Sequence, residues 1–266
     1  MPTSAQSEPP ETHRLRETAE SFGTDAERYD RTRPAYPAAL IERIAATAPG
    51  PDVLDVGCGT GIAARQLAAT GCRVLGVEPD ARMAALARRY GTEAEVTTIE
   101  EWDPAGRTFD AVVAGQTWHW VDAPAGTAKA ARALRPGGLL TVFWNVAQPG
   151  PAASEGFAAA YRRAVPDLQL PATQSALAAY EPMFTKAADG IRAVDGFSAP
   201  REWRYEWHHT YTRDEWLDQL PTGGIFTRLP RPALDALLAE VGAVIDAQGG
   251  GVPIAYTTVA VTARRG

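Results

Sequence analysis

Three alternating glycines are the first residues in this sequence whose spacing could do chemistry. Gly57, Gly59 and Gly61 follow the apolar residues 53–56 and precede residues 62–67, which have the composition of a helix. Glycine tolerates positive φ and has no Cβ, so such a turn lets a ligand approach the backbone, and the helix that follows presents free N–H groups to it. The turn predicts a nucleotide-like cofactor. A tight connection between a strand and a helix, without any ligand, is the alternative.

A carboxylate at the end of the next apolar run narrows the choice of cofactor. Glu78 follows Gly57 at about the 20-residue separation expected for an acid that binds a ribose. At the tip of a strand it can accept hydrogen bonds from both ribose hydroxyls, so the pair predicts an adenosyl site. A dinucleotide fingerprint would place its third glycine or alanine where Ile62 stands, whereas the third glycine here is Gly61. This difference disfavours NAD and FAD.

Four stretches in order resemble one family. Residues 55–61 (Asp-Val-Gly-Cys-Gly-Thr-Gly) and 77–80 (Val-Glu-Pro-Asp) resemble the cofactor-binding signature of class I S-adenosylmethionine-dependent methyltransferases. Residues 109–114 resemble the fourth strand of that family, and residues 133–140 resemble the turn into its fifth strand. The resemblance implies an α/β fold: a Rossmann-like, doubly wound, seven-stranded and mostly parallel sheet with an antiparallel last strand, and a helical cap.

Two flanking stretches resemble a branch of this family. Residues 29–37 and 118–120 are similar to the small-molecule methyltransferases that include trans-aconitate methyltransferase-like proteins. The resemblance implies that S-adenosyl-L-methionine is the cofactor and that its methyl group passes to a small-molecule acceptor. Neither the acceptor nor the attacking atom can be read from these residues.

The resemblance also implies which residues surround the cofactor. Tyr29 is expected to close on its methionyl part, and Arg33 is expected to meet a carboxylate of cofactor or acceptor. The alternative is that the aromatic residues Phe22, Tyr29 and Tyr36 only pin this segment to the sheet. Thr98 and Ile99 match the positions that hold the adenine, but many relatives carry Asp where Thr98 stands. The residues expected to bind the cofactor are Tyr29, Arg33, Asp55, Gly57, Gly59, Gly61, Glu78, Pro79, Thr98, Ile99 and Gln116.

Candidate acceptor residues follow the predicted fourth strand, at the strand ends where ligands bind in open α/β sheets. His119 is the first candidate to position an acceptor or to take its proton, because imidazole titrates near neutral pH. A hydrogen-bonded histidine that locks the turn is the alternative. His209 is a second candidate base. The residues expected to bind the acceptor are Tyr36, Trp118, Trp120 and Tyr211.

The elements that must position these side chains have patterns of their own. Aromatic and polar residues alternate over 203–211, which predicts a strand whose aromatic face lines the acceptor pocket or belongs to the core. The Thr-x-x-Glu spacing of Thr212 and Glu215 predicts a capping box, and Asp122 with Pro124 predicts another helix start. Further predicted elements are a helix opening at Pro37, helices over 81–89, 152–164, 175–188 and 231–245, and strands over 95–98 and 255–262.

Length and composition favour a single domain, because 266 residues can bury one large core and no linker divides them. The N-terminal residues lack the apolar side chains whose burial would offset ordering. We expect a disordered arm over 1–18 and one methyltransferase domain over 19–266, with a cofactor-binding core over 50–145, a helical cap and acceptor-pocket elements over 146–246, and a last strand over 255–263.

Charge and residue usage exclude several partners. With 26 basic and 32 acidic residues the net charge is -6, and the sequence has no dense Lys/Arg cluster, which disfavours nucleic acid. No signal peptide or membrane-spanning run is present, so a soluble, cytoplasmic protein is expected. The four histidines have no partners at metal-site spacing, so we predict no metal. A binding module without turnover, or methylation of a protein or RNA, are the alternative functions.

Overall fold

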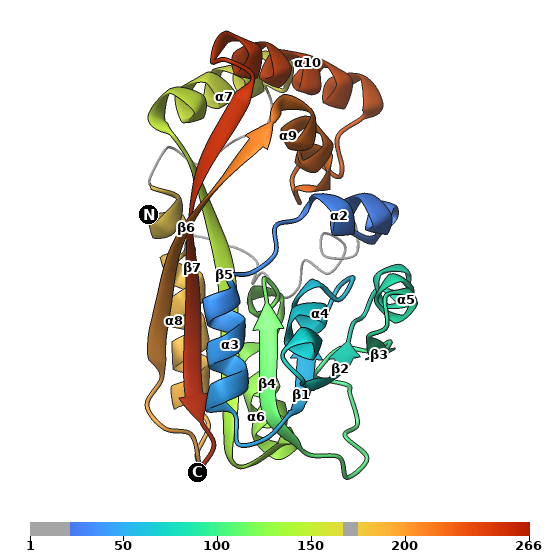
Figure 1. The fold of residues 1–266 in the computed structure, drawn as a ribbon, viewed down its shortest axis with the longest axis vertical. Helices are drawn as coiled ribbons and strands as arrows, with labels where there is room; N and C mark the ends of the chain where they lie inside the picture. The colour runs from blue at the N-terminus through green and yellow to red at the C-terminus, as the bar shows by residue number, and fades with distance from the viewer. Residues whose placement is uncertain (1–21, 167–174) are drawn as a thin grey trace, which may run out of the picture.

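A seven-stranded sheet organises the computed structural model, which describes residues 22–166 and 175–266 (Figure 1). Its strand order is β3-β2-β1-β4-β5-β7-β6. Strands β1 to β5 pair in parallel, whereas β7 is antiparallel to both of its neighbours, β5 and β6. The predicted α/β fold is therefore confirmed. The strands are β1 Asp52–Val56, β2 Arg73–Val77, β3 Glu93–Glu95, β4 Phe109–Gly115, β5 Leu134–Pro149, β6 Arg201–Thr212 and β7 Gly251–Arg264.

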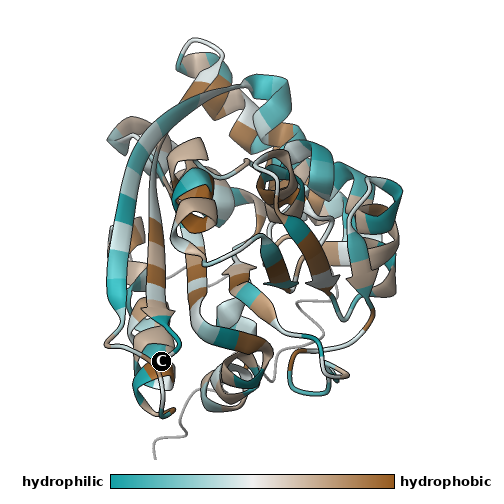
Figure 2. Cartoon of the chain, turned by 60° about the horizontal axis from the view of Figure 1, so that its bottom comes forward, coloured by the Kyte–Doolittle hydropathy of each residue, from teal (hydrophilic) through white to brown (hydrophobic). Residues whose placement is uncertain are grey.

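Helices cover both faces of this sheet because neighbouring strand residues point to opposite sides. Val53 packs with α3 and α4 on one face, and Leu54 packs with α6 and α8 on the other. The α-helices are α2 Ala26–Thr32, α3 Ala38–Thr47, α4 Ile62–Ala69, α5 Ala81–Arg89, α6 Ala123–Ala133, α7 Pro151–Ala164, α8 Ala176–Arg192, α9 Arg213–Gln219 and α10 Arg231–Ala247, and the short 3-10 helices are η2 Phe22–Asp25, η3 Trp118–Trp120 and η4 Leu220–Thr222. Figure 2 shows hydrophobic residues concentrated in the central strands.

Two helix starts form as their sequences predict. The Asp122 side chain accepts the Ala125 N–H at 3.0 Å and begins α6. The Thr212 hydroxyl accepts the Glu215 N–H, and the Glu215 carboxylate accepts the Thr212 N–H, which is the complete capping box of α9. These local contacts fix where the two helices begin.

The third strand differs from its prediction. The structure places β3 at Glu93–Glu95 instead of 95–98, with Glu95 paired to Val77 of β2. The Trp102 indole N–H donates to the Glu95 carboxylate at 2.6 Å, and Arg107 also binds that carboxylate. These contacts turn the chain away from the sheet after Glu95, so residues 98 and 99 do not continue the strand.

The cap is built on long strands as well as on helices. Strands β5, β6 and β7 run beyond the parallel part of the sheet, and α7, α9 and α10 pack around their extensions (Figure 1). Helix α8 was expected in the cap, but its Phe184 and Ile191 are buried against the main sheet. The expected disordered arm over 1–18 lies outside the described residues. Within the described ranges, no helix has the length and apolarity needed to cross a bilayer.

Candidate cofactor and acceptor site

The glycine turn after β1 forms the floor of a pocket. Gly57 and Gly59 have φ of +63° and +56°, in the left-handed region that favours glycine. A Cβ at Gly57 would overlap the Thr117 methyl group, while a Cβ at Gly59 would meet only Met83 Cε at 3.7 Å. Gly59 therefore leaves open space that a ligand can fill. Gly61, with φ of +88°, is the N-cap of α4 and lies outside the pocket lining.

Glu78 lies at the end of β2, across the turn from the glycines. Its Oε2 accepts the Gly59 N–H at 2.9 Å, and its Oε1 accepts the Asp80 N–H at 2.9 Å. Burial raises the pKa of the carboxyl to about 7, against the opposing effect of these two N–H groups. The two backbone donors hold the carboxylate in one orientation toward the pocket.

Asp55 supplies a second buried acid beneath the same turn. It is 1% exposed, and neither of its side-chain oxygens has a hydrogen-bond partner among the described residues. Burial, and then the nearby charge of Glu78, raise its pKa to about 8, against a smaller opposing effect of the Ala64 backbone N–H, which does not reach hydrogen-bond geometry. A buried polar group without a partner is costly, so this carboxyl suits a ligand that brings a donor or a positive charge.

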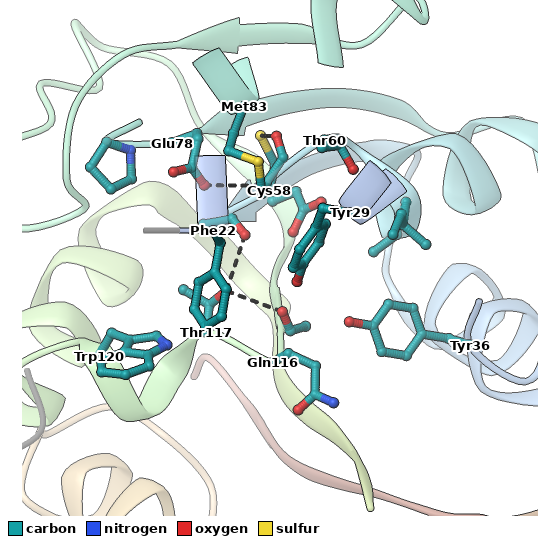
Figure 3. A pocket seen from close by; sticks show the side chains of 17 residues that line it. Phe22, Tyr29, Tyr36, Cys58, Thr60, Glu78, Met83, Gln116, Thr117 and Trp120 are labelled. Atoms are coloured by element: carbon teal, nitrogen blue, oxygen red, sulfur yellow. Dashed lines mark hydrogen bonds between the residues drawn. The ribbon is translucent and has the colours of Figure 1, made fainter. Parts of the chain in front are cut away.

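These observations fit an adenosyl cofactor that carries an amino acid group. The open space above Gly59 admits a ligand against the backbone, Glu78 offers oriented acceptors for hydroxyls, and Asp55 offers an acceptor for an ammonium group. Figure 3 shows Glu78 at one end of the pocket and Tyr36 at the other, with Phe22 and Tyr29 between them.

The structure brings most of the expected cofactor residues together. Phe22, Met83 and Thr117 also line the pocket and were not predicted. Thr117 donates to the Gly57 carbonyl oxygen at 3.0 Å, a contact between positions 60 residues apart that no local pattern signals. The expected residues that line this pocket are Tyr29, Asp55, Gly57, Gly59, Glu78, Pro79 and Gln116, joined by Tyr36 and Trp120 from the expected acceptor set.

Three expected cofactor residues besides Gly61 lie elsewhere. Ile99 is buried in the core that faces α6 and α8, and Thr98 accepts the Glu101 N–H at 3.4 Å. Both residues lie outside the pocket lining because β3 ends at Glu95. Arg33 lines a neighbouring cavity instead of the pocket itself.

That neighbouring cavity has a volume of about 450 Å³ and opens beside the cofactor pocket. Much of its lining is aromatic, and it comes from the cap as well as from the main sheet. Tyr161, Tyr180, Trp216, Phe226 and Tyr256 were not predicted as site residues, because their elements are distant in sequence. The residues that line both compartments are Phe22, Tyr29, Tyr36, Ile62, Gln116 and Trp120.

Arg33 brings a positive charge to this aromatic cavity. Its guanidinium donates to the Thr222 carbonyl oxygen and lies over the Tyr29 ring, with Cζ 4.9 Å from the ring centroid. Its Nε is buried and has no partner in the described chain. No Asp or Glu is among the described residues that line the cavity, so an anionic group of a ligand would complete this site.

His119 lines the same cavity, but its surroundings do not favour a base. Its Nδ1 accepts the Trp144 indole N–H at 3.1 Å. Burial, with a smaller contribution from the charge of Lys186, lowers its pKa to about 4. The ring is therefore neutral at physiological pH.

Three other expected acceptor-side residues do not line the cavity. Trp118 is 2% exposed and packs in the main core. Tyr211 is buried behind the cavity wall, where its hydroxyl is 2.7 Å from that of Tyr256. His209 is exposed on β6 and lines a separate groove beside α9. Trp207 and Tyr211 of β6 line the same groove as His209, whereas Trp203 and Tyr205 pack in the core.

Helix α2 lies over the cofactor pocket and is fastened by charge. None of the residues of α2 is fully buried. Arg28 and Arg31 both bind the Asp218 carboxylate of α9 at 2.8 Å, and Asp30 binds Arg65 of α4 at 2.7 Å. The helix that presents Tyr29 is therefore tied to the cap as well as to the core.

Comparisons with known proteins agree with this geometry. A family model described as a methyltransferase domain matches residues 29–248. An uncharacterized methyltransferase of Mycobacterium tuberculosis (strain H37Rv) is 38% identical over 132 residues, which cover 49% of this chain and 54% of the relative. A ubiquinone biosynthesis O-methyltransferase of Methylocella silvestris is 39% identical over 95 residues, 33% of this chain and 37% of the relative. The chain spans about half the length, or less, of these curated relatives.

Among solved structures, a protein of Anaeromyxobacter dehalogenans described as a type II methyltransferase superposes with a TM-score of 0.62. The two sequences are 22% identical, and the match covers 87% of this chain and 97% of the other. At this identity the likeness concerns the fold alone.

Proposed function

This chain belongs to the class I S-adenosylmethionine-dependent methyltransferases, and we propose that its acceptor is a small molecule held in the aromatic cavity. S-adenosylmethionine is the cofactor. When bound, it supplies an electrophilic methyl group on a sulfonium. The observation that carries the proposal is that the cofactor pocket and the cavity of about 450 Å³ share six lining residues. A methyl group held at this shared wall would face an acceptor in the cavity.

In the proposed arrangement, the residues of the cofactor pocket hold successive parts of the donor. Glu78 accepts from the ribose hydroxyls, and Asp55 accepts from the amino group of the methionyl part. Gly59 keeps the backbone clear for the ligand, and Tyr29 with Gln116 borders the side that faces the cavity. Arg33 binds a carboxylate, which belongs either to the cofactor or to the acceptor.

The cavity suits catalysis by positioning. Aromatic walls exclude water and restrict a flat or apolar acceptor, and the few polar groups among them fix its orientation. The polar groups of this lining that are not shared with the cofactor pocket are the side chains of Arg33, His119, Asn145 and Gln219, the hydroxyls of Tyr161, Tyr180 and Tyr256, and the indole N–H of Trp216. A cytoplasmic location, and the absence of nucleic acid and membrane partners, stay predictions from composition.

Filling the cavity tests the proposal without disturbing the cofactor pocket. Ala147 lines the acceptor cavity alone, so Ala147→Phe should abolish transfer of labelled methyl groups to acceptors in a metabolite extract while S-adenosylmethionine still binds in isothermal titration. Ala255→Phe, the same change at an exposed position of β7, is the matched control and should retain transfer. Undiminished transfer by Ala147→Phe would contradict the proposed acceptor site.

A further inference from the structure

We infer that two copies of this chain pair edge to edge through β6, as an antiparallel twofold dimer in which Arg204 lies opposite Glu206 of the partner subunit. Strand β6 is the last strand of the sheet on one side and runs along its left rim in Figure 1. The cofactor pocket lies at the ends of β1, β2 and β4, away from this rim. The inference therefore does not depend on the proposed function.

The two edges of the sheet are built differently. Strand β3, at one edge, covers only Glu93–Glu95, and the side chains of Trp102 and Arg107 bind its last residue. Strand β6, at the other edge, has 12 residues in one continuous register with β7, and none of them is proline. Natural proteins blunt edge strands by shortness, bulges or proline, because a long regular edge is a template for another strand. β6 is such a template.

The outer backbone groups of β6 are available to a further strand. Every second residue of an edge strand turns its N–H and C=O groups away from the sheet. Within the described ranges β6 pairs with β7 alone, and its main other neighbour is α9, the helix that directly follows it. A second copy of the chain fits this edge because it brings an identical row of outward donors and acceptors.

The exposed side chains of β6 alternate in charge. Glu202, Arg204, Glu206 and His208 are exposed, and their spacing of two residues places them on one face. Arg204 binds Glu202 at 2.9 Å and Glu181 of α8 at 3.4 Å, and its side chain is still 44% exposed. Glu206 has no ion-pair partner among the described residues. An edge of a single sign would repel its own copy, whereas alternating signs can match in an antiparallel pair.

One register matches these charges. Pairing centred on Tyr205 places Arg204 opposite the partner's Glu206 and Glu202 opposite the partner's His208, and the twofold axis repeats each contact. Moving the centre to Arg204 would oppose Glu202 to the partner's Glu206. Moving it to Glu206 would oppose that residue to its own copy. Both neighbouring registers thus set like charges directly against each other, which selects the pairing about Tyr205.

Sedimentation velocity of the full chain over about 1 to 300 μM tests the pairing. The inference predicts a reversible equilibrium in which the mass rises from the 28.4 kDa of one chain toward twice that value. A chain that stays monomeric over the whole range would overturn it.

Charge reversal tests whether β6 forms the interface. Glu206→Arg should weaken dimerisation about 10-fold or more, because it opposes two positive charges at both symmetry-related contacts. The matched control is Glu155→Arg, the same change at an exposed position of α7, which should dimerise like the wild type. A dimer that Glu206→Arg leaves unchanged would overturn the inference.

A charge swap tests the register. Arg204→Glu alone should weaken the dimer, and Arg204→Glu combined with Glu206→Arg should return its affinity to within about threefold of wild type, because opposite signs again face each other. A double variant weaker than both single variants would overturn the pairing about Tyr205. Thermal melts and titration with S-adenosylmethionine show that each variant is folded, and Glu206→Arg with its control decides the question if Arg204→Glu is not.

Discussion

Replacing Gly59 by alanine should weaken cofactor binding while the fold survives. The backbone at Gly59 has φ of +56°, and a Cβ there would meet only Met83 Cε at 3.7 Å. The ligand-free protein therefore has room for the methyl group and bears only the cost of the left-handed backbone, about 1–2 kcal/mol. A bound cofactor would lie against this turn, so the added methyl should overpack the complex.

The expected loss of affinity follows from that overpacking. Forcing a methyl group into filled space costs about 1–3 kcal/mol, which corresponds to roughly 5-fold to 150-fold weaker binding. Gly106→Ala is the matched control, because Gly106 has φ of +79°, open space for a Cβ and an exposed position away from the pocket. Both variants should lose similar unfolding free energy in denaturant titrations, and only Gly59→Ala should lose affinity in isothermal titration.

A third variant separates packing of the turn from packing of the ligand. Gly57→Ala should destabilise the ligand-free protein more than either of the other two, because its Cβ would overlap the Thr117 methyl group. If Gly59→Ala binds S-adenosylmethionine within about twofold of Gly106→Ala, the cofactor does not lie against the turn, and the reasoning is refuted.

Three further predictions follow from charge. The ligand-free protein should lose stability as pH rises from about 6.5 to 8, because the raised pKa values of Asp55 and Glu78 make the folded chain bind protons that the unfolded chain has released. Asp55→Asn should flatten this decline in thermal melts. A wild-type stability that does not change over this pH range would contradict the prediction. Asp218→Asn should raise the Kd for S-adenosylmethionine about twofold to fivefold by loosening α2, and added salt should shrink the difference between variant and wild type. Equal affinity at low salt would show that these ion pairs do not hold α2 over the pocket. Arg33→Met should weaken binding of whichever ligand carries the carboxylate, and Arg33→Lys should recover part of this loss. Unchanged affinity for both cofactor and acceptor in Arg33→Met would refute the proposed role of Arg33.

The parts of the fold that depend on local sequence were predictable. The strand, glycine turn and helix at residues 53–67 form as their pattern indicates, and Glu78 lies at the end of the neighbouring strand. Asp122 and Thr212 cap the helices that their spacing predicts. In each case the decisive contacts join residues within a few positions, or strands whose order follows from the family resemblance.

The parts of the fold and of the site that depend on contacts between distant residues could not be predicted from the sequence. Periodicity gave no indication that Glu95 would bind Trp102 and Arg107 and so end β3 early, which moved residues 98 and 99 away from the pocket. Both tryptophans of the Trp-His-Trp stretch look alike in the sequence, yet Trp118 packs in the core while Trp120 lines the cofactor pocket. Which aromatic residues face the cavity is decided by the cap.

The role of His119 shows the same limit at the level of chemistry. Its residue type and its place after β4 suggest a base as readily as a hydrogen-bonded histidine that locks the turn. The distinction depends on Trp144, a residue 25 positions later whose indole reaches Nδ1 only because β5 lies beside β4. Sequence spacing does not contain that contact.

A crystal structure with S-adenosylhomocysteine would test the central claim most directly, because the position of its sulfur marks where the methyl group is transferred. The account predicts the ribose hydroxyls within hydrogen-bond distance of Glu78 and the sulfur at the wall shared with the aromatic cavity, between Gln116 and Tyr29. A sulfur that faces away from this cavity, or a ribose that does not contact Glu78, would contradict it.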